Sequence, residues 1–246
     1  MQKKTKHLKT LKERRDDSKL SSIEISYRNV FKELLQDIDI REKNGVALSV
    51  STGDGLSDYF VFSNTKGTVR KIIATDIVDN PVDKEGVEIL KKLGDWEFKK
   101  VEAEKPLPFP NESFDLVFHQ DVIEHVKKPY LFVSEQYRVL KKGGSLIIGT
   151  PNILRPANLV KLMLGKLRFP VKIGENEEIG EYVHIQEFSE FQLKNLLEEV
   201  GFEDIDMKCC YFGIWPLRIT FSLYPKGKVG KGMCHYLMIK CRKPRI

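Results

Sequence analysis

The feature that most constrains the fold is a regular alternation of strand-like and helix-like segments. Short runs of β-branched and apolar residues are followed by longer segments with apolar residues at helical spacing. This alternation is typical of a parallel sheet covered by helices on both faces. The strands are expected near residues 46–51, 71–76, 97–101, 114–119 and 145–150. The helices are expected near residues 27–38, 56–63, 82–93, 121–126 and 130–141.

The end of the chain has a different pattern. Ser189 with Gln192 three residues later forms a capping box and predicts the start of another helix. Two strand-like runs follow, at residues 205–212 and 235–241, and residues 213–233 between them read as a loop-rich connection. We expect these two strands to pair antiparallel at one end of the sheet.

With 246 residues the chain is long enough for one catalytic domain with additions. We divide it into a basic leader, residues 1–22, and a single domain, residues 23–246. Residues 153–187 form an insertion after a strand's carboxyl end, where open α/β sheets bind ligands. Its short amphipathic helix predicts a substrate lid. A packing helix or a helix lying on a membrane surface are the alternatives.

Charge is unevenly distributed along the chain. Residues 1–20 carry a net charge of +5 and residues 226–246 carry +7, although the whole chain carries only +6. The body is therefore acidic and the two ends are basic. Solvated tails are the favoured reading, and contact with RNA or an anionic membrane surface is the alternative. The sequence does not indicate an oligomeric state.

The chain has the features of a cytoplasmic protein. The first residues lack the apolar core of a secretory signal, and no apolar run is long enough to cross a membrane. The four cysteines include no C-x-x-C pair, so we expect reduced thiols in the core.

A glycine turn, residues 51–55, follows the first strand. Gly53 and Gly55 permit a sharp bend and close contact between the backbone and a ligand. Asp76 ends the second strand, where its carboxylate could accept hydrogen bonds from both hydroxyls of a ribose. Asp58 stands where a dinucleotide site would need a third small residue. The turn therefore favours an adenosyl ligand without phosphates.

Further motifs follow in order along the chain. They are Leu107-Pro108-Phe109-Pro110-Asn111-Glu112-Ser113-Phe114-Asp115-Leu116-Val117, Asp121-Val122-Ile123-Glu124-His125-Val126, Arg138-Val139-Leu140-Lys141-Lys142-Gly143-Gly144 and Gly149-Thr150-Pro151-Asn152. This series resembles the class I methyltransferases that use S-adenosylmethionine (SAM), particularly the branch akin to the enzymes of ubiquinone and menaquinone synthesis. The resemblance runs from about residue 46 to residue 243.

The resemblance implies a Rossmann-like, doubly wound α/β sheet of seven mostly parallel strands with a final antiparallel strand. It implies SAM as cofactor, S-adenosylhomocysteine as product, and SAM lying over the carboxyl ends of the first, second and fourth strands. The residues that it places around SAM are Ser51, Gly53, Gly55, Asp76, Ile77, Glu102, Ala103, His119 and Gln120.

Two residues depart from the family pattern. Ser49 stands where the first strand usually carries an acid, and Ser51 stands where the turn usually begins with glycine. These departures support an alternative function, in which the chain keeps the fold as a binding protein without catalysis. An RNA methyltransferase that uses the basic ends is a further alternative.

Four residues are candidates for catalysis: Asp121, Glu124, His125 and His184. The first three share one face if their segment is helical, and each could remove a proton from an acceptor. The alternatives are that they brace the neighbouring loops or, as the least favoured reading, that they bind a divalent metal ion. A hydrogen bond from His184 to a backbone carbonyl is the more common alternative.

The residues after the fourth strand bear on the acceptor. His119-Gln120-Asp121-Val122 does not match the Asn/Asp-Pro-Pro-aromatic turn of amino-directed methyltransferases, so DNA is not an expected substrate. We expect transfer to oxygen of a small molecule or of a glycan or lipid precursor. The variable insertion leaves the acceptor itself unidentified.

Overall fold

A computed structural model describes residues 10–40, 44–167, 184–214, 219–223 and 231–245. Within these residues, seven strands form one sheet and two strands form a separate hairpin. The strands of the main sheet are β1 (Gly45–Val50), β2 (Val69–Asp76), β3 (Asp95–Lys100), β4 (Phe114–Gln120), β5 (Leu140–Pro151), β6 (Glu203–Cys209) and β9 (Tyr236–Arg242).

The sheet confirms the expected topology. Its order is β3-β2-β1-β4-β5-β9-β6, and β1 to β5 are mutually parallel. Strand β9 is antiparallel to both neighbours, β5 and β6, so the last two strands of the sheet pair as predicted. The chain leaves β1 toward β2 on one side and returns to β4 on the other. In doubly wound sheets this reversal opens a ligand-binding crevice at the carboxyl ends of the strands.

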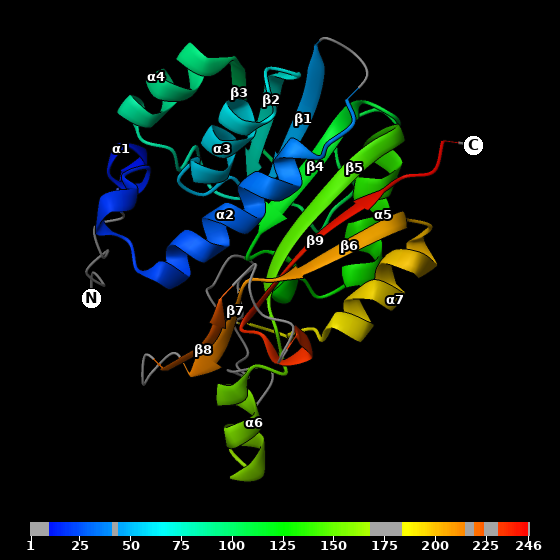
Figure 1. Ribbon diagram of the computed structural model, residues 1–246. Helices are drawn as coiled ribbons and strands as arrows, with labels where there is room; N and C mark the ends of the chain where they lie inside the picture. The colour runs from blue at the N-terminus through cyan, green and yellow to red at the C-terminus, as the bar shows by residue number, and fades with distance from the viewer. Residues whose placement is uncertain (1–9, 41–43, 168–183, 215–218, 224–230, 246) are drawn as a thin grey trace, which may run out of the picture.

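Helices cover both faces of the sheet (Figure 1). One face carries α2 (Ser22–Gln36), α3 (Leu56–Asn64) and α4 (Lys84–Leu93), and the other carries α5 (Pro129–Val139) and α7 (Glu190–Val200). Each layer has its own apolar core, because successive strand residues point to opposite faces. Leu116 and Phe118 lie in the core under α2 and α3, whereas Val117 lies in the core under α5 and α7.

The leader packs partly against the domain. Short helix α1 (Leu11–Arg14) lies beside α4, and Leu11 is fully buried there. Residues 1–9 lie outside the described part of the chain.

The carboxyl edge of the sheet carries the additions. Helix α6 (Pro156–Met163) lies next to the hairpin of β7 (Tyr211–Ile214) and β8 (Ile219–Leu223) below this edge (Figure 1). Helix α6 belongs to the segment predicted as an insertion, of which residues 168–183 are outside the described part.

Two predicted elements were wrong. The strand expected at 205–212 is divided at Cys210 into β6 and β7, and the expected loop contains β8. Strand β9 begins at Tyr236 and pairs with β6, whereas β7 pairs with β8. The helix expected over 121–126 is a single 3-10 turn, η2 (Ile123–His125). Asp121 precedes it with a φ of 54°, a left-handed conformation that excludes it from any right-handed helix.

Among the described residues the four cysteines form no disulfide, and Cys210, Cys234 and Cys241 are buried. None of the helices that the structure describes combines the length and the apolar composition that a membrane crossing requires.

Candidate functional site

The glycine turn joins β1 to α3 through left-handed residues. Ser51, Gly53 and Gly55 have φ values of 60°, 56° and 79°. A Cβ atom on Gly55 would lie 3.1 Å from Leu90 Cδ1, whereas a Cβ on Gly53 would meet no atom within 4 Å. Gly55 is thus required by packing, while Gly53 presents bare backbone to open space. Such a surface allows a ligand to approach the main chain closely.

Asp76 lies beside this turn at the end of β2. One carboxylate oxygen, Oδ2, accepts a hydrogen bond from the backbone N–H of Gly53 at 3.3 Å. The other, Oδ1, accepts from the N–H of Val78 at 3.3 Å. The carboxylate therefore links the turn to the second strand. Each oxygen retains a lone pair for a further donor.

A second carboxylate, that of Asp58, lies under the turn. It is fully buried and accepts hydrogen bonds from three side chains on different elements. The donors are Ser49 Oγ at 2.6 Å, Thr52 Oγ1 at 2.9 Å and Trp96 Nε1 at 2.7 Å. Burial raises the pKa of Asp58 from 3.8 to about 6, although the three hydrogen bonds act in the opposite direction. The family pattern carries an acid at the position of Ser49. In this chain the carboxylate of Asp58 lies next to that position.

The other cofactor candidates differ in exposure. Ile77 and Ala103 are half-buried, and Glu102 pairs with Lys105 at 2.6 Å. Gln120 Nε2 donates to Ser57 Oγ at 3.0 Å, which ties the end of β4 to the first turn of α3.

His119 is buried against Phe132 of α5, with ring centroids 5.2 Å apart. Burial lowers its pKa to about 3, so its imidazole is neutral at ordinary pH.

The 3-10 turn η2 follows β4 and places the side chain of Glu124 in the interior of the protein. Its side chain is fully buried, and its Oε2 accepts a hydrogen bond from Thr150 Oγ1 at 2.9 Å. Desolvation raises the pKa of Glu124 to about 7. The backbone carbonyl of Glu124 accepts from the N–H groups of Ile185 and Gln186, at 2.9 and 3.2 Å. These bonds hold the segment after the insertion against η2.

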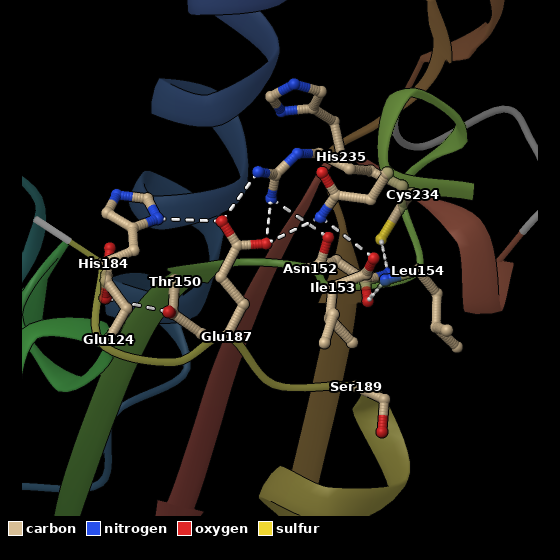
Figure 2. A network of polar contacts seen from close by, with 12 residues as sticks. Glu124, Thr150, Asn152, Ile153, Leu154, His184, Glu187, Ser189, Cys234 and His235 are labelled. Atoms are coloured by element: carbon tan, nitrogen blue, oxygen red, sulfur yellow. Dashed lines mark hydrogen bonds and ion pairs between the residues drawn. The ribbon is translucent and has the colours of Figure 1, made fainter. Parts of the chain in front are cut away.

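That segment also contains His184, which contacts a buried ion pair (Figure 2). His184 Nδ1 lies 2.8 Å from Glu187 Oε1. Both oxygens of Glu187 bind the Arg155 guanidinium, at 2.5 and 2.7 Å, and Oε2 also accepts from Asn158 Nδ2 at 2.9 Å. The hydrogen bond to Glu187 raises the pKa of His184. Burial alone raises the pKa of Glu187, but the bonds from His184 and Arg155 lower it overall.

Three of the four catalytic candidates come together. Glu124, His125 and His184 each place a potential ligand atom within 4.8 Å of the other two, and we call these residues the polar cluster. The rings of His125 and His184 are perpendicular, with centroids 5.0 Å apart. Asp121 is exposed and lies outside this set. Desolvation raises its pKa, although the nearby charges of both histidines act in the opposite direction.

Comparison with known proteins agrees with this geometry. Residues 48–148 match a family model described as a methyltransferase domain. A probable S-adenosylmethionine-dependent methyltransferase from Mycolicibacterium smegmatis is 33% identical over 107 residues, which cover 44% of this chain and 35% of that relative. This chain is therefore similar to methyltransferase domains over residues 48–148. It spans about a third of the length of this mycobacterial relative.

Other relatives match more of the chain. A ubiquinone/menaquinone biosynthesis C-methyltransferase from Cronobacter sakazakii is 27% identical over 157 residues, which cover 59% of this chain and 61% of that protein. The crystal structure of a SAM-dependent methyltransferase from Methanosarcina mazei has a TM-score of 0.55 at 20% identity, and covers 83% of this chain and 95% of that one. This structural likeness shows a shared fold.

The methyltransferase family uses SAM as its cofactor, and the residues present fit it. The unobstructed backbone at Gly53 would receive the amino-acid end of SAM. The carboxylate of Asp76, which lies beside Gly53, would receive the ribose hydroxyls. Gln120 borders the same edge from β4.

Sequence reasoning missed two parts of this candidate site. The sequence indicates only that Asp58 disfavours a dinucleotide. Its role in holding the turn is not visible there, because its three hydrogen-bond donors come from separate segments. Glu187 and its partners Arg155 and Asn158 went unnoticed. Arg155 and Glu187 are 32 residues apart across the insertion, and no local pattern connects them.

Proposed function

We propose that the protein is a SAM-dependent methyltransferase that acts on an oxygen of a small molecule or of a glycan or lipid precursor. The observation that carries this proposal is the proximity of the cofactor turn to the polar cluster. Gln120 at the end of β4 bonds Ser57 beside the turn, and Asp121 and η2 follow directly in the chain. Cofactor and proton-accepting side chains therefore share one edge of the sheet.

The proposed chemistry is an in-line displacement. When bound, SAM would supply an electrophilic methyl group, whose bond to the sulfonium sulfur breaks to leave S-adenosylhomocysteine. The protein's residues align an acceptor oxygen with that methyl group and exclude water. Asp121, Glu124, His125 and His184 are the candidates that take the proton which the acceptor hydroxyl loses as the new O–C bond forms. No covalent intermediate with the protein is needed.

The insertion supports an acceptor with apolar parts. On α6 and just after it, Leu162, Met163 and Leu164 expose large apolar side chains, with Lys161 among them. A surface that mixes apolar groups with a cation suits an acceptor that combines a hydrocarbon portion with polar groups. The helix lies beside β7 at the edge where the acceptor would enter.

A second candidate reaction is transfer to carbon. It is favoured by the name of the Cronobacter sakazakii relative, which is a C-methyltransferase. The two reactions make chemically distinct products, because a methyl carbon bonded to oxygen differs in its NMR shift from one bonded to carbon.

The experiment uses SAM labelled with ¹³C at the methyl group, incubated with the full-length protein and with lipid, glycan and small-molecule extracts. The expected result is a labelled product with the shift of an O-methyl group. A C-methyl shift would replace the oxygen assignment. Binding of SAM with no labelled product from any extract would instead favour a binding protein without catalysis.

A further inference from the structure

The polar cluster contains the side chains from which proteins build divalent-metal sites. Glu124 and His125 come from η2, and His184 comes from the segment that follows the insertion. Two imidazoles and one carboxylate form a ligand set that suits Zn²⁺ and similar transition-metal ions.

The carboxylate of Glu124 has one oxygen to spare. Oε2 is engaged by Thr150 Oγ1 at 2.9 Å. Oε1 is buried and has no hydrogen-bond partner among the residues that the structure describes. A buried polar atom without a partner is costly, and such atoms are few in folded proteins. A cation at the cluster would satisfy this oxygen.

His184 is oriented as metal-binding histidines are. Its Nδ1 contacts Glu187 Oε1 at 2.8 Å, which leaves Nε2 as the ligand atom (Figure 2). Glu187 is itself fixed by Arg155 and Asn158. A carboxylate bonded to the far nitrogen of a histidine sets the tautomer and orientation of the ring in metal sites.

The main chain already holds the ligands close. The N–H groups of Ile185 and Gln186 both donate to the carbonyl of Glu124, so the two ligand-bearing segments are joined without a metal. Ligand atoms around a tetrahedral ion with bonds of about 2.1 Å lie roughly 3.4 Å apart. From a mutual separation within 4.8 Å, small rotations of the two half-buried histidines are enough to close the site.

We propose that Glu124, His125 and His184 bind one Zn²⁺-type divalent ion next to the carboxyl end of β4. Three protein ligands leave a coordination position open. Given the methyltransferase function proposed above, the open position would receive an oxygen of the acceptor, which restricts the acceptors to molecules with a metal-binding oxygen near the methylated atom. With the ion bound, Glu124, His125 and His184 are engaged as ligands, and Asp121 is the candidate that takes the acceptor's proton. The competing explanation is that the three side chains only brace η2 against the segment at 184–187.

The test measures metal binding directly. Untagged full-length protein is treated with a chelator, dialysed against micromolar Zn²⁺ and analysed for metal and protein content. In parallel, Co²⁺ is titrated as a spectroscopic probe. We expect one Zn²⁺ per chain, and visible Co²⁺ absorption much stronger than that of the hydrated ion, which Zn²⁺ then abolishes. Substoichiometric Zn²⁺ together with the spectrum of hydrated Co²⁺ would overturn the proposal, whichever variants fold.

Variants locate the site. Glu124→Gln and His184→Gln are expected to weaken Zn²⁺ binding by about tenfold or more. His235→Gln, the same change at a histidine outside the cluster, should leave it unchanged. Equal binding by all three variants would overturn the assignment to these residues. Calorimetry with SAM on the same samples separates the methyltransferase proposal from the metal-site proposal. If the protein binds SAM but no metal, the methyltransferase proposal stands and the metal site is refuted.

Discussion

At the scale of single residues, Asp58 explains how the turn is held although Ser49 replaces the family's acid. Its carboxylate joins the end of β1, the turn and β3 through Ser49, Thr52 and Trp96. The acid that the family pattern has in the first strand is here located in the first turn of the following helix, α3. The serine is then a hydrogen-bond donor to the carboxylate, so its presence does not imply a damaged site.

The raised pKa of Asp58 predicts a specific pH dependence of stability. Its pKa is about 6 in the folded protein and 3.8 ordinarily, so its protonation stabilises the fold fully below pH 3.8, and this contribution is lost as the pH rises through 6. Two pKa units correspond to about 3 kcal/mol. Asp58→Asn removes the titration. The free energy of unfolding of this variant relative to wild type should therefore rise between pH 4.5 and 7.5.

Urea unfolding of both proteins across this pH range measures the difference. An Asn side chain can still accept from Trp96 and Thr52 and donate to Ser49, so we expect the variant to fold. Parallel pH curves for the two proteins would contradict the burial of a titrating carboxylate at this position.

Gly53 and Gly55 form a matched pair for mutation. Gly55→Ala adds a contact of 3.1 Å with Leu90 and one of 3.2 Å with Val82, on top of left-handed strain of roughly 1–2 kcal/mol. Gly53→Ala incurs the strain without the contacts. We expect Gly55→Ala to lower the melting temperature more, and Gly53→Ala to lower SAM affinity at smaller cost in stability. Equal melting temperatures would show that the space around Gly55 is larger than described.

At the scale of elements, the strands of the parallel sheet could be predicted because each is an apolar run between turn residues. The 3-10 turn η2 could not, since the left-handed Asp121 is set by a distant contact: its N–H donates to the carbonyl of Gly149 at 2.9 Å. The strand β8 was missed for a similar reason. It pairs with β7 and not with a strand of the main sheet, and sequence periodicity does not indicate which partner a strand takes.

The base of the insertion should depend on the ion pair between Arg155 and Glu187. Only 14% of the Arg155 side chain and 1% of that of Glu187 are exposed. Arg155→Met would leave a buried carboxylate without its cation and should lower the free energy of unfolding by about 3 kcal/mol.

Hydrogen exchange locates this effect. Protection of the amides at 184–189 should fall in the variant, while that of β1 and β4 changes less. Arg155→Lys, which keeps the charge, should be milder. Unchanged exchange at 184–189 would show that the ion pair does not anchor this segment.

At the scale of the whole molecule, the described residues of the two basic ends pair with the acidic body. In the leader, Lys12 pairs with Glu85 and Arg14 with Asp54. Near the carboxyl terminus, Arg242 pairs with Glu203 and Arg245 with Asp39, and Lys243 donates to the carbonyl of Leu140. Many of these cations are therefore already matched within the chain.

This charge matching predicts weak binding to RNA. Fluorescence anisotropy with a labelled single-stranded RNA should show no saturable binding at micromolar protein in 150 mM salt, because cations that are already paired, as several of the described ones are, contribute less to counterion displacement. Tight binding that weakens steeply with salt would contradict this expectation and favour the RNA methyltransferase alternative.

The most direct test of the account is calorimetry of the full-length protein with SAM and S-adenosylhomocysteine. Wild type should bind both. Asp76→Ala should lose about tenfold or more in affinity, since hydrogen bonds to a charged group contribute about 1.5–3 kcal/mol each. Asp79→Ala, which removes an exposed carboxylate three residues later, should bind like wild type. If neither ligand binds at millimolar concentration, or if Asp76→Ala binds as wild type does, the site described around the glycine turn is not a SAM site.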